Sequence, residues 1–207
     1  MLFKIYTDTK ESTPEAILKP LCEALHEGEV IIIPTDTRYS ICCDALNGRS
    51  LEHLADLKGV DPKKHRFSIL CNNLSQVSQY AKVSDDIFRV MKANTPGPFT
   101  FVLPTGTLLP SIYKGRKEVG VRIPDFPFVH HLIEYFGKPI TGFSLPLLQG
   151  KEDEAYRYHP ELIQEGWQPH VAHIVDGGVG TMSVSAIIDC TATPFQILRE
   201  GPRQLIL

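Results

Sequence analysis

The residues most able to do chemistry in this chain are basic and hydroxyl side chains that stand in or beside apolar segments. Arg122 and Arg199 each lie in or next to an apolar run, where a charge must be paired or must wait for an anion. An internal ion pair with Asp176, Asp189 or Glu200 is one explanation. The other is a bound anion such as a nucleotide, because a guanidinium fits phosphate or carboxylate oxygens with two parallel hydrogen bonds. The candidates are Thr35, Thr37, Lys58, Thr100, Arg122, Ser144, Ser185 and Arg199.

One stretch, IIIPTDTRYS at residues 31–40, concentrates such side chains at the end of a predicted strand. Pro34 lacks an N–H and fixes φ, so it ends the sheet ladder there. Thr35, Asp36 and Thr37 follow at once, and open α/β sheets place ligand sites outside the carboxyl ends of their strands. A capped turn, in which Thr and Asp bond to their own backbone, explains the same residues equally well. Both interpretations stay open.

Several common catalytic motifs are missing from the chain. It contains no GxxxxGK[ST] loop, no GxGxxG after a strand and no GxSxG. The glycine-rich DGGVG at 176–180 joins two predicted strands, so a turn is favoured over a phosphate-binding loop at a helix N-terminus. Neither His130-His131 nor the pair His170 and His173 has a nearby Cys or carboxylate to complete a tetrahedral set. We therefore expect no protein-held metal site.

The composition indicates an ordinary globular protein. The 207 residues, 43% hydrophobic and 22% charged, suit a single domain over residues 1–207. The five cysteines are odd in number and form no CxxC, which favours buried free thiols in a reducing compartment. No apolar run reaches the roughly 18 residues of a membrane span, and the first residues have no signal-peptide pattern. We expect no membrane association and a cytoplasmic location.

The net charge of −3 argues against a protein that wraps long nucleic acid by charge alone. RNA binding would have to use a local patch, and one candidate is the basic run Lys58, Lys63, Lys64, His65 and Arg66. The alternative for such a charge run is a solvated loop.

Strand-like and helical patterns alternate along the chain. Most strands lack period-two alternation, which predicts that both faces of the sheet are covered. We therefore expect an α/β fold: a single-domain, twisted, mixed β-sheet with flanking helices. Strands are predicted at 2–7, 29–33, 67–71, 99–103, 119–124, 138–143, 171–175, 185–189 and 195–199, and helices at 12–28 (beginning near 12 or near Pro20), 50–58, from 75, 84–93 and 128–136, with a surface loop or helix at 150–168.

Seven segments together resemble those of a known family, in the family's order. They are PTDTRYS at 34–40, the Lys58 segment, TPGPFTFVLP at 95–104, VGVRIP at 119–124, VDGGVG at 175–180, SVSAIIDCT at 183–191 and ILREGP at 197–202. Over about residues 5–205 the chain resembles the YrdC/YciO family, which includes threonylcarbamoyl-AMP synthases. Its length and residues 65–81 are more similar to the YciO branch.

The resemblance implies a concave basic face and a nucleotidyltransferase reaction. Threonine, bicarbonate and ATP, which brings Mg²⁺, would give threonylcarbamoyl-adenylate and pyrophosphate for tRNA threonylcarbamoyladenosine modification. It implies substrate binding by Thr35, Thr37, Arg122 and Ser185, nucleotide binding by Lys58, Ser144 and Arg199, and catalytic roles for Lys58 and Arg122. The alternative that it implies is a double-stranded RNA-, tRNA- or rRNA-binding protein without that catalysis, using Lys58, Lys63, Lys64 and Arg66.

Departures from the enzymes' pattern predict weak or altered activity. Val60 stands where the family's Lys-x-Arg motif has its arginine, and Gly142 stands where its Ser-x-Asn motif has its serine. Cys71 replaces a histidine, and Ala186 replaces the threonine of a Ser-Thr pair. A third possibility is a nucleotide-binding enzyme for a different small acid, because Phe143 would reshape the pocket.

Overall fold

Ten strands form one mixed sheet in the order β1-β8-β2-β3-β7-β4-β6-β5-β9-β10. The computed structural model describes residues 1–5, 12–62, 64, 65, 67–110, 113 and 117–207. Pairing is parallel for β1 with β8, β2 with β8, β4 with β6 and β5 with β9, and antiparallel elsewhere. The strands are β1 (Leu2–Lys4), β2 (Ile31–Ile33), β3 (Ser40–Asp44), β4 (Ser68–Leu70), β5 (Phe99–Pro104), β6 (Glu118–Arg122), β7 (Ile140–Ser144), β8 (His173–Asp176), β9 (Ala186–Asp189) and β10 (Gln196–Arg199).

The helices begin and end where their capping residues place them. Ser84 and Asn47 accept hydrogen bonds from first-turn amides, and Gly28 ends the first helix in the left-handed conformation, with φ of 89°. Pro20 lies inside that helix, which begins near the earlier of the two predicted starts. The helices are α1 (Glu15–Glu27), α2 (Gly48–Lys58), α3 (Leu74–Tyr80), α4 (Asp85–Asn94), α5 (Pro127–Phe136) and α6 (Pro160–Trp167), with a 3-10 helix η2 (Glu154–Arg157).

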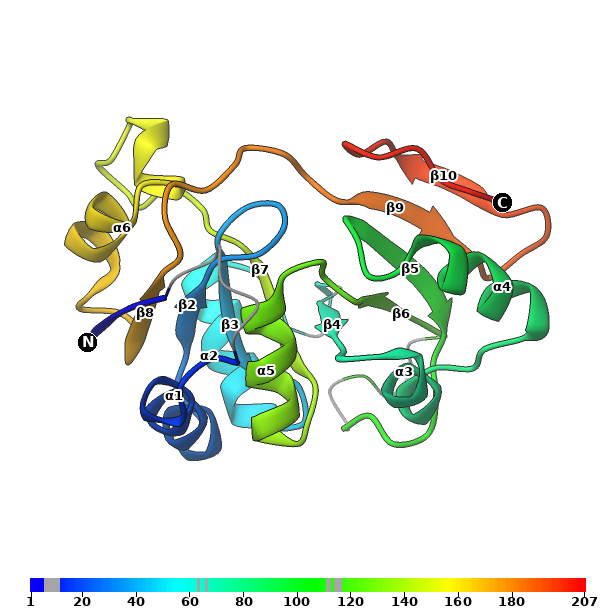
Figure 1. Ribbon diagram of the computed structural model, residues 1–207, viewed down its shortest axis with the longest axis horizontal. Coiled ribbons are helices and arrows are strands. Elements are labelled where there is room, and N and C mark those ends of the chain that lie inside the picture. The colour runs from blue at the N-terminus through cyan, green and yellow to red at the C-terminus, as the bar shows by residue number, and fades with distance from the viewer. Residues whose placement is uncertain (6–11, 63, 66, 111–112, 114–116) are drawn as a thin grey trace.

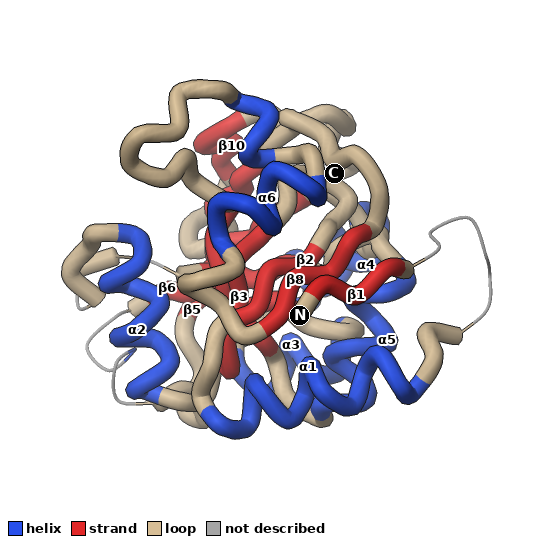
Figure 2. The backbone as a smooth tube through the Cα atoms, turned by 90° about the vertical axis from the view of Figure 1, so that its left-hand side faces the viewer, coloured by secondary structure: helices blue, strands red, loops and turns tan. Residues whose placement is uncertain are grey.

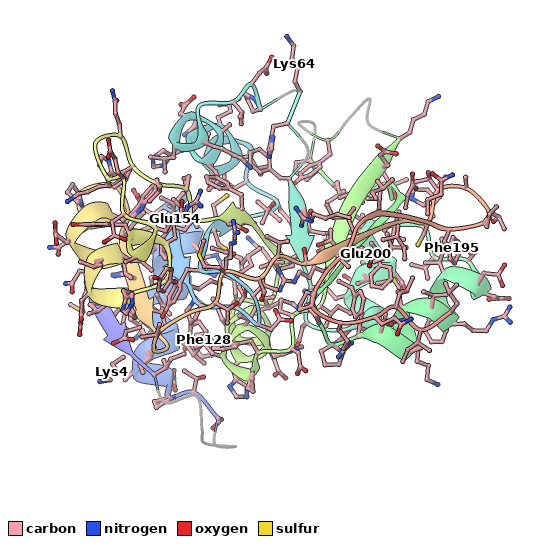
Figure 3. All side chains as sticks on the ribbon, turned by 90° about the horizontal axis from the view of Figure 1, so that it is seen from above. Lys4, Lys64, Phe128, Glu154, Phe195 and Glu200 are labelled. Atoms are coloured by element: carbon pink, nitrogen blue, oxygen red, sulfur yellow. The ribbon has the colours of Figure 1, made fainter. Side chains whose placement is uncertain are left out.

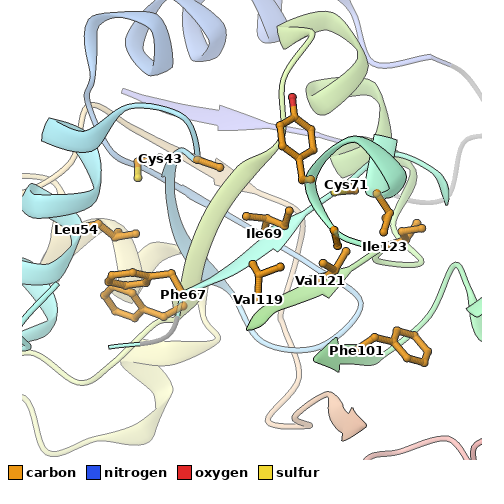
Figure 4. Close-up of a cluster of buried hydrophobic side chains, with 14 of the residues drawn as sticks. Cys43, Leu54, Phe67, Ile69, Cys71, Phe101, Val119, Val121 and Ile123 are labelled. Carbon is orange, nitrogen blue, oxygen red and sulfur yellow. The ribbon is translucent and has the colours of Figure 1, made fainter. Parts of the chain in front are cut away.

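Both faces of the sheet are covered, as the strand pattern predicted. Ile31 and Ile33 pack in a cluster with residues of α1 and α5, whereas Ile32 belongs to a second, larger cluster. Figure 2 shows α1 and α5 on one side of β1, β2 and β8, with α6 on the other side. Figure 4 shows part of the larger cluster, which includes Phe67 and Val121. The sequence prediction of a twisted, mixed α/β sheet is confirmed.

One strand was not predicted. Residues 40–44 form β3, which pairs antiparallel with β2 through Ile33 and Ser40 and with β7 on its other side. Pro34 does end β2, but the chain returns at once as a hairpin, so residues 34–39 are a loop between paired strands. The segment 150–168, expected as loop or helix, contains both η2 and α6.

The connection between β8 and β9, residues 177–185, is called the strap here. It contains no helix or strand. Figure 1 shows it crossing over the molecule from β8 to β9, with the loop after β2 rising toward it. The strap therefore joins the two halves of the sheet on the side toward which the β2–β3 loop projects.

One further expectation, that of buried free thiols, is met by the described part of the chain. The five cysteines are all buried and free. Among the described residues, none of the helices combines the length and apolar character needed to cross a bilayer.

Candidate functional site

A cavity of about 300 Å³ lies on the middle of the sheet, where seven strands contribute to its wall. Small residues form its floor, because Ser40 pairs with Ser144 across β3 and β7, and Ser68 pairs with Gly142 across β4 and β7. Such residues leave room that larger side chains would fill. The lining residues are Ser40, Lys58, His65, Ser68, Leu70, Thr100, Arg122, Gly142, Phe143, Ser144, Ser185, Ile187 and Arg199.

Arg122 is the cation at the cavity floor. It stands at the end of β6 and is 8% exposed. One terminal nitrogen donates to Oδ1 of Asp36 in an ion pair and to Oγ1 of Thr37 at 2.9 Å. Its Nε has no hydrogen-bond partner among the described residues. Burial lowers the pKa of Arg122, and the Asp36 charge opposes that shift. Because this Nε is itself fully buried, what Arg122 offers a ligand is the positive charge of a guanidinium in the cavity wall.

The turn after β2 holds Asp36 and Thr37 in place. The amide of Thr37 donates to Oγ1 of Thr35 at 3.1 Å, and the Thr35 hydroxyl donates to the carbonyl of Arg38 at 2.8 Å. The two threonine hydroxyls lie 3.2 Å apart. Both interpretations of this stretch therefore hold: it is a self-capped turn, and the turn presents Asp36 and Thr37 to the arginine of the cavity.

Lys58 reaches the cavity from the end of α2. Its ammonium donates to Nε2 of His65 at 2.9 Å and lies 4.4 Å from the centre of the Phe143 ring. An ammonium has no acceptor capacity, so His65 accepts at Nε2. Partial burial lowers the pKa of Lys58 from its ordinary value of 10.5. This cation is held at the wall with donor capacity left for a ligand.

Arg199 enters from β10, on the far side of the cavity. Its Nε donates to the carbonyl of Ser185 at 3.0 Å, and its Nη2 donates to the Ser185 hydroxyl at 3.3 Å. That hydroxyl lies 2.9 Å from the hydroxyl of Thr100. Burial lowers the pKa of Arg199, and the charges of Arg38 and Arg122 lower it further. Because Arg122 and Arg199 line the same cavity, both can act on one ligand.

The structure brings most of the predicted site residues together. Lys58, Arg122, Ser144, Ser185 and Arg199 all line the cavity, and Thr100 lines it with them. Thr37 stands behind Arg122, and the Thr35 hydroxyl is used within its own turn. Both threonines are buried.

The predicted RNA-binding residues do not form one patch in the described chain. Lys58 faces the cavity, whereas the Lys64 side chain is 86% exposed and extends away from the sheet (Figure 3). Its nearest carboxylate, that of Asp61, is 3.9 Å away. Lys63 and Arg66 lie outside the described residues. Val60, at the position of the missing arginine, packs against the apolar core.

Two functional contacts were not predicted. Asp36 is the ion-pair partner of Arg122, in place of the three acids first considered. His65 is the hydrogen-bond partner of Lys58, seven positions along the chain. The position of Asp36 beside two threonines at a strand end was the only signal for the first contact. Nothing in the spacing indicated the second.

The charge of the cavity selects its ligand class. Three basic side chains, those of Lys58, Arg122 and Arg199, line it, and none of its described lining residues is an acid. Asp36 offsets only the charge of Arg122. Among the described residues, no cluster of three or more His, Cys, Asp or Glu is arranged to hold a metal ion. The arrangement fits an anion with several oxygens, such as a polyphosphate or a carboxylate.

Known proteins share this fold and cover the chain almost fully. YciO of Escherichia coli (strain K12) is 30% identical over 201 residues, which are 96% of this chain and 94% of that protein. The crystal structure of E. coli YciO matches with a TM-score of 0.85 over 99% of this chain and 97% of that one. The threonylcarbamoyl-AMP synthase of Pyrococcus abyssi is 28% identical, and the match covers 95% of this chain and 57% of that protein.

The P. abyssi protein Sua5 has also been crystallised in complex with L-threonine. That structure matches with a TM-score of 0.83 at 25% identity, over 97% of this chain and 57% of that one. The family model Sua5_yciO_yrdC, described as "Telomere recombination", matches residues 23–201. The chain belongs to the Sua5/YciO/YrdC family.

Proposed function

We propose that the cavity binds ATP and a threonine-like amino acid side by side and forms a carbamoyl-adenylate from them with bicarbonate. The observation that carries the proposal is the convergence of Lys58, Arg122 and Arg199 on one cavity whose described lining residues include no acid. The L-threonine bound to Sua5 and the threonylcarbamoyl-AMP synthases among the relatives support this choice of ligand. The product would serve as the donor for the threonylcarbamoyladenosine modification of tRNA.

The proposed chemistry needs little beyond positioning and charge. The threonine amine and bicarbonate give a carbamate with loss of water. A carbamate oxygen then attacks the α-phosphorus of ATP, forming an O–P bond, while the bond to the β-phosphate oxygen breaks and pyrophosphate leaves. Holding the reactants in line and neutralising phosphate charge supplies most of the acceleration in such reactions. Mg²⁺ would enter with ATP and not on protein ligands.

Each cavity residue has a part in this proposal. Arg122 would hold the amino-acid carboxylate through the positive charge of its guanidinium. Lys58 and Arg199 would hold the phosphates. The hydroxyls of Ser144 and Ser185 would form hydrogen bonds with the nucleotide, as donors or as acceptors. The wall carries no cation at position 60, and Phe143 occupies space above Lys58, so turnover is expected to be slow or directed to a different small acid.

The test is pyrophosphate release from ATP in the presence of Mg²⁺, L-threonine and bicarbonate. We expect release that requires both threonine and bicarbonate and that falls about 10²–10³-fold in Lys58→Ala, the range for losing one transition-state donor. Lys64→Ala is the matched control, because it removes the same charge from an exposed position. Release that is equal in Lys58→Ala and in the unmodified protein would refute the proposal.

A further inference from the structure

Arg38, in the loop after β2, is held by the strap. Its Nε donates to the carbonyl of Met182 at 2.9 Å. One residue earlier on the loop, the carbonyl of Thr37 accepts from the hydroxyl of Thr181 at 3.0 Å. The loop and the strap are thus joined at two adjacent points, and the Arg38 side chain is fixed at its Nε. The sequence analysis assigned Arg38 no role.

Arg199 is held by the same strap in the same manner. Its Nε donates to the carbonyl of Ser185, three residues after Met182, and Ser185 lines the cavity. Both arginines therefore use Nε on a strap carbonyl. The terminal nitrogens of Arg38 have no hydrogen bond to a described residue, and those of Arg199 have one, the 3.3 Å contact to Ser185.

The two arginines lack a countercharge within the described chain. Neither forms an ion pair with an Asp or Glu of the described residues. They are held by carbonyls three residues apart on the strap, and the Arg38 charge adds to burial in lowering the pKa of Arg199. Like charges held together without an acid between them raise the local positive potential, which a polyanion with many oxygens would neutralise.

We propose that Arg38 and Arg199 form a polyphosphate-binding pair at the strap side of the cavity, with Arg38 as a further ligand-binding residue. This inference rests on the proposed function in one respect: the polyphosphate is the β,γ end of bound ATP, and the leaving pyrophosphate after reaction. Arg122 and Lys58 then hold the reacting end, and the strap carbonyls orient the two arginine forks toward the distal phosphates.

The experiment is calorimetric titration of the full chain with ATP, AMP and inorganic pyrophosphate. Arg38→Ala is compared with Arg49→Ala, which removes an equal charge from the exposed start of α2. We expect Arg38→Ala to weaken ATP and pyrophosphate binding by about tenfold or more, the scale of a lost hydrogen bond to a charged group. AMP binding should change less than about twofold, because AMP lacks the distal phosphates. Arg38→Gln retains an N–H for Met182 and should give the same loss, which separates charge from folding.

Equal affinity of Arg38→Ala and Arg49→Ala for ATP and pyrophosphate would overturn this inference and leave the proposed function standing. Pyrophosphate binding that depends on Arg38, in a protein that binds no ATP, would support the pair and refute the proposed function. An unmodified protein that binds neither ligand would refute both.

Discussion

Arg122 and Asp36 form a buried ion pair between the end of β6 and the loop after β2, with each side chain 9% exposed. The pair joins the cavity floor to the loop that carries Arg38 and touches the strap. One oxygen of Asp36, Oδ2, and the Nε of Arg122 have no partner in the described chain. Both atoms are fully buried, so the pair fixes the floor of the cavity from within the protein.

Removal of Asp36 should destabilise the fold strongly. In Asp36→Ala, the Arg122 charge would stay buried without its partner, and breaking a buried pair in this way costs about 3–5 kcal/mol. Urea unfolding measures the free energy of unfolding. The control is Asp86→Ala, which breaks the exposed pair with Arg89 and should cost less than about 1 kcal/mol. Equal losses of stability in the two variants would contradict this prediction. They would show that leaving the Arg122 charge buried without Asp36 costs no more than breaking an exposed ion pair.

Lys58 should lose its proton at a lower pH than an ordinary lysine. Burial disfavours the charged form and lowers its pKa below 10.5. Between the lowered pKa and 10.5 the unfolded state binds more protons, so this group makes the free energy of unfolding rise with pH there. Carbon-13 NMR of labelled lysines measures the titration, with Lys58→Arg to assign the signal. A Lys58 signal that titrates together with that of exposed Lys64 would contradict this prediction.

Gly142 should tolerate no side chain at the cavity floor. A Cβ there would meet the carbonyl of Ile41 and would lie 2.7 Å from Sγ of Cys42, on the neighbouring strand β3. We expect Gly142→Ala to lower the free energy of unfolding by about 1–3 kcal/mol, as overpacking does. Gly48→Ala is the control, because a Cβ at Gly48 meets no atom within 4 Å. Thermal unfolding that shows no difference between the two variants would refute the crowding.

Tyr39 should hold the start of the strap. Its hydroxyl donates to the carbonyl of Gly178 at 2.7 Å and accepts from the amide of Gly177 at 3.0 Å. In Tyr39→Phe both bonds are lost, and we expect about 1–3 kcal/mol less stability and faster amide exchange at Gly177. Tyr135→Phe, whose hydroxyl contacts Glu15 at the surface, is the control. Unchanged exchange at Gly177 would mean that the strap is held elsewhere.

Most helices and strands were predicted correctly, because helix-capping residues and the apolar runs of strands are recognisable within short stretches of sequence. Ser84 caps the start of α4 and Gly28 ends α1, as expected, and the apolar strands pack on both faces of the sheet. The strand at residues 40–44 was not predicted. Pro34 indicated the end of the sheet at this point, whereas the chain turns back after it and pairs with β2 again.

The sequence predicted which residues share the candidate site better than it predicted their hydrogen-bond and ion-pair partners. Lys58, Arg122 and Arg199 share a cavity, as their types and the resemblance indicated. The partners Asp36 and His65 could not be predicted, because they depend on how a loop and a helix end meet across the sheet. The hydrogen bond from Arg38 to the strap joins residues that are 144 positions apart in the sequence, and no local sequence pattern could predict it.

The most direct test of the central claim is a difference electron-density map of crystals soaked with ATP and L-threonine. The account predicts density in the cavity, with the phosphates at Lys58 and Arg199 and the threonine carboxylate beside the guanidinium of Arg122. Density found instead in the hollow between α4 and residues 193–195, with the cavity between Lys58 and Arg199 unfilled, would contradict it.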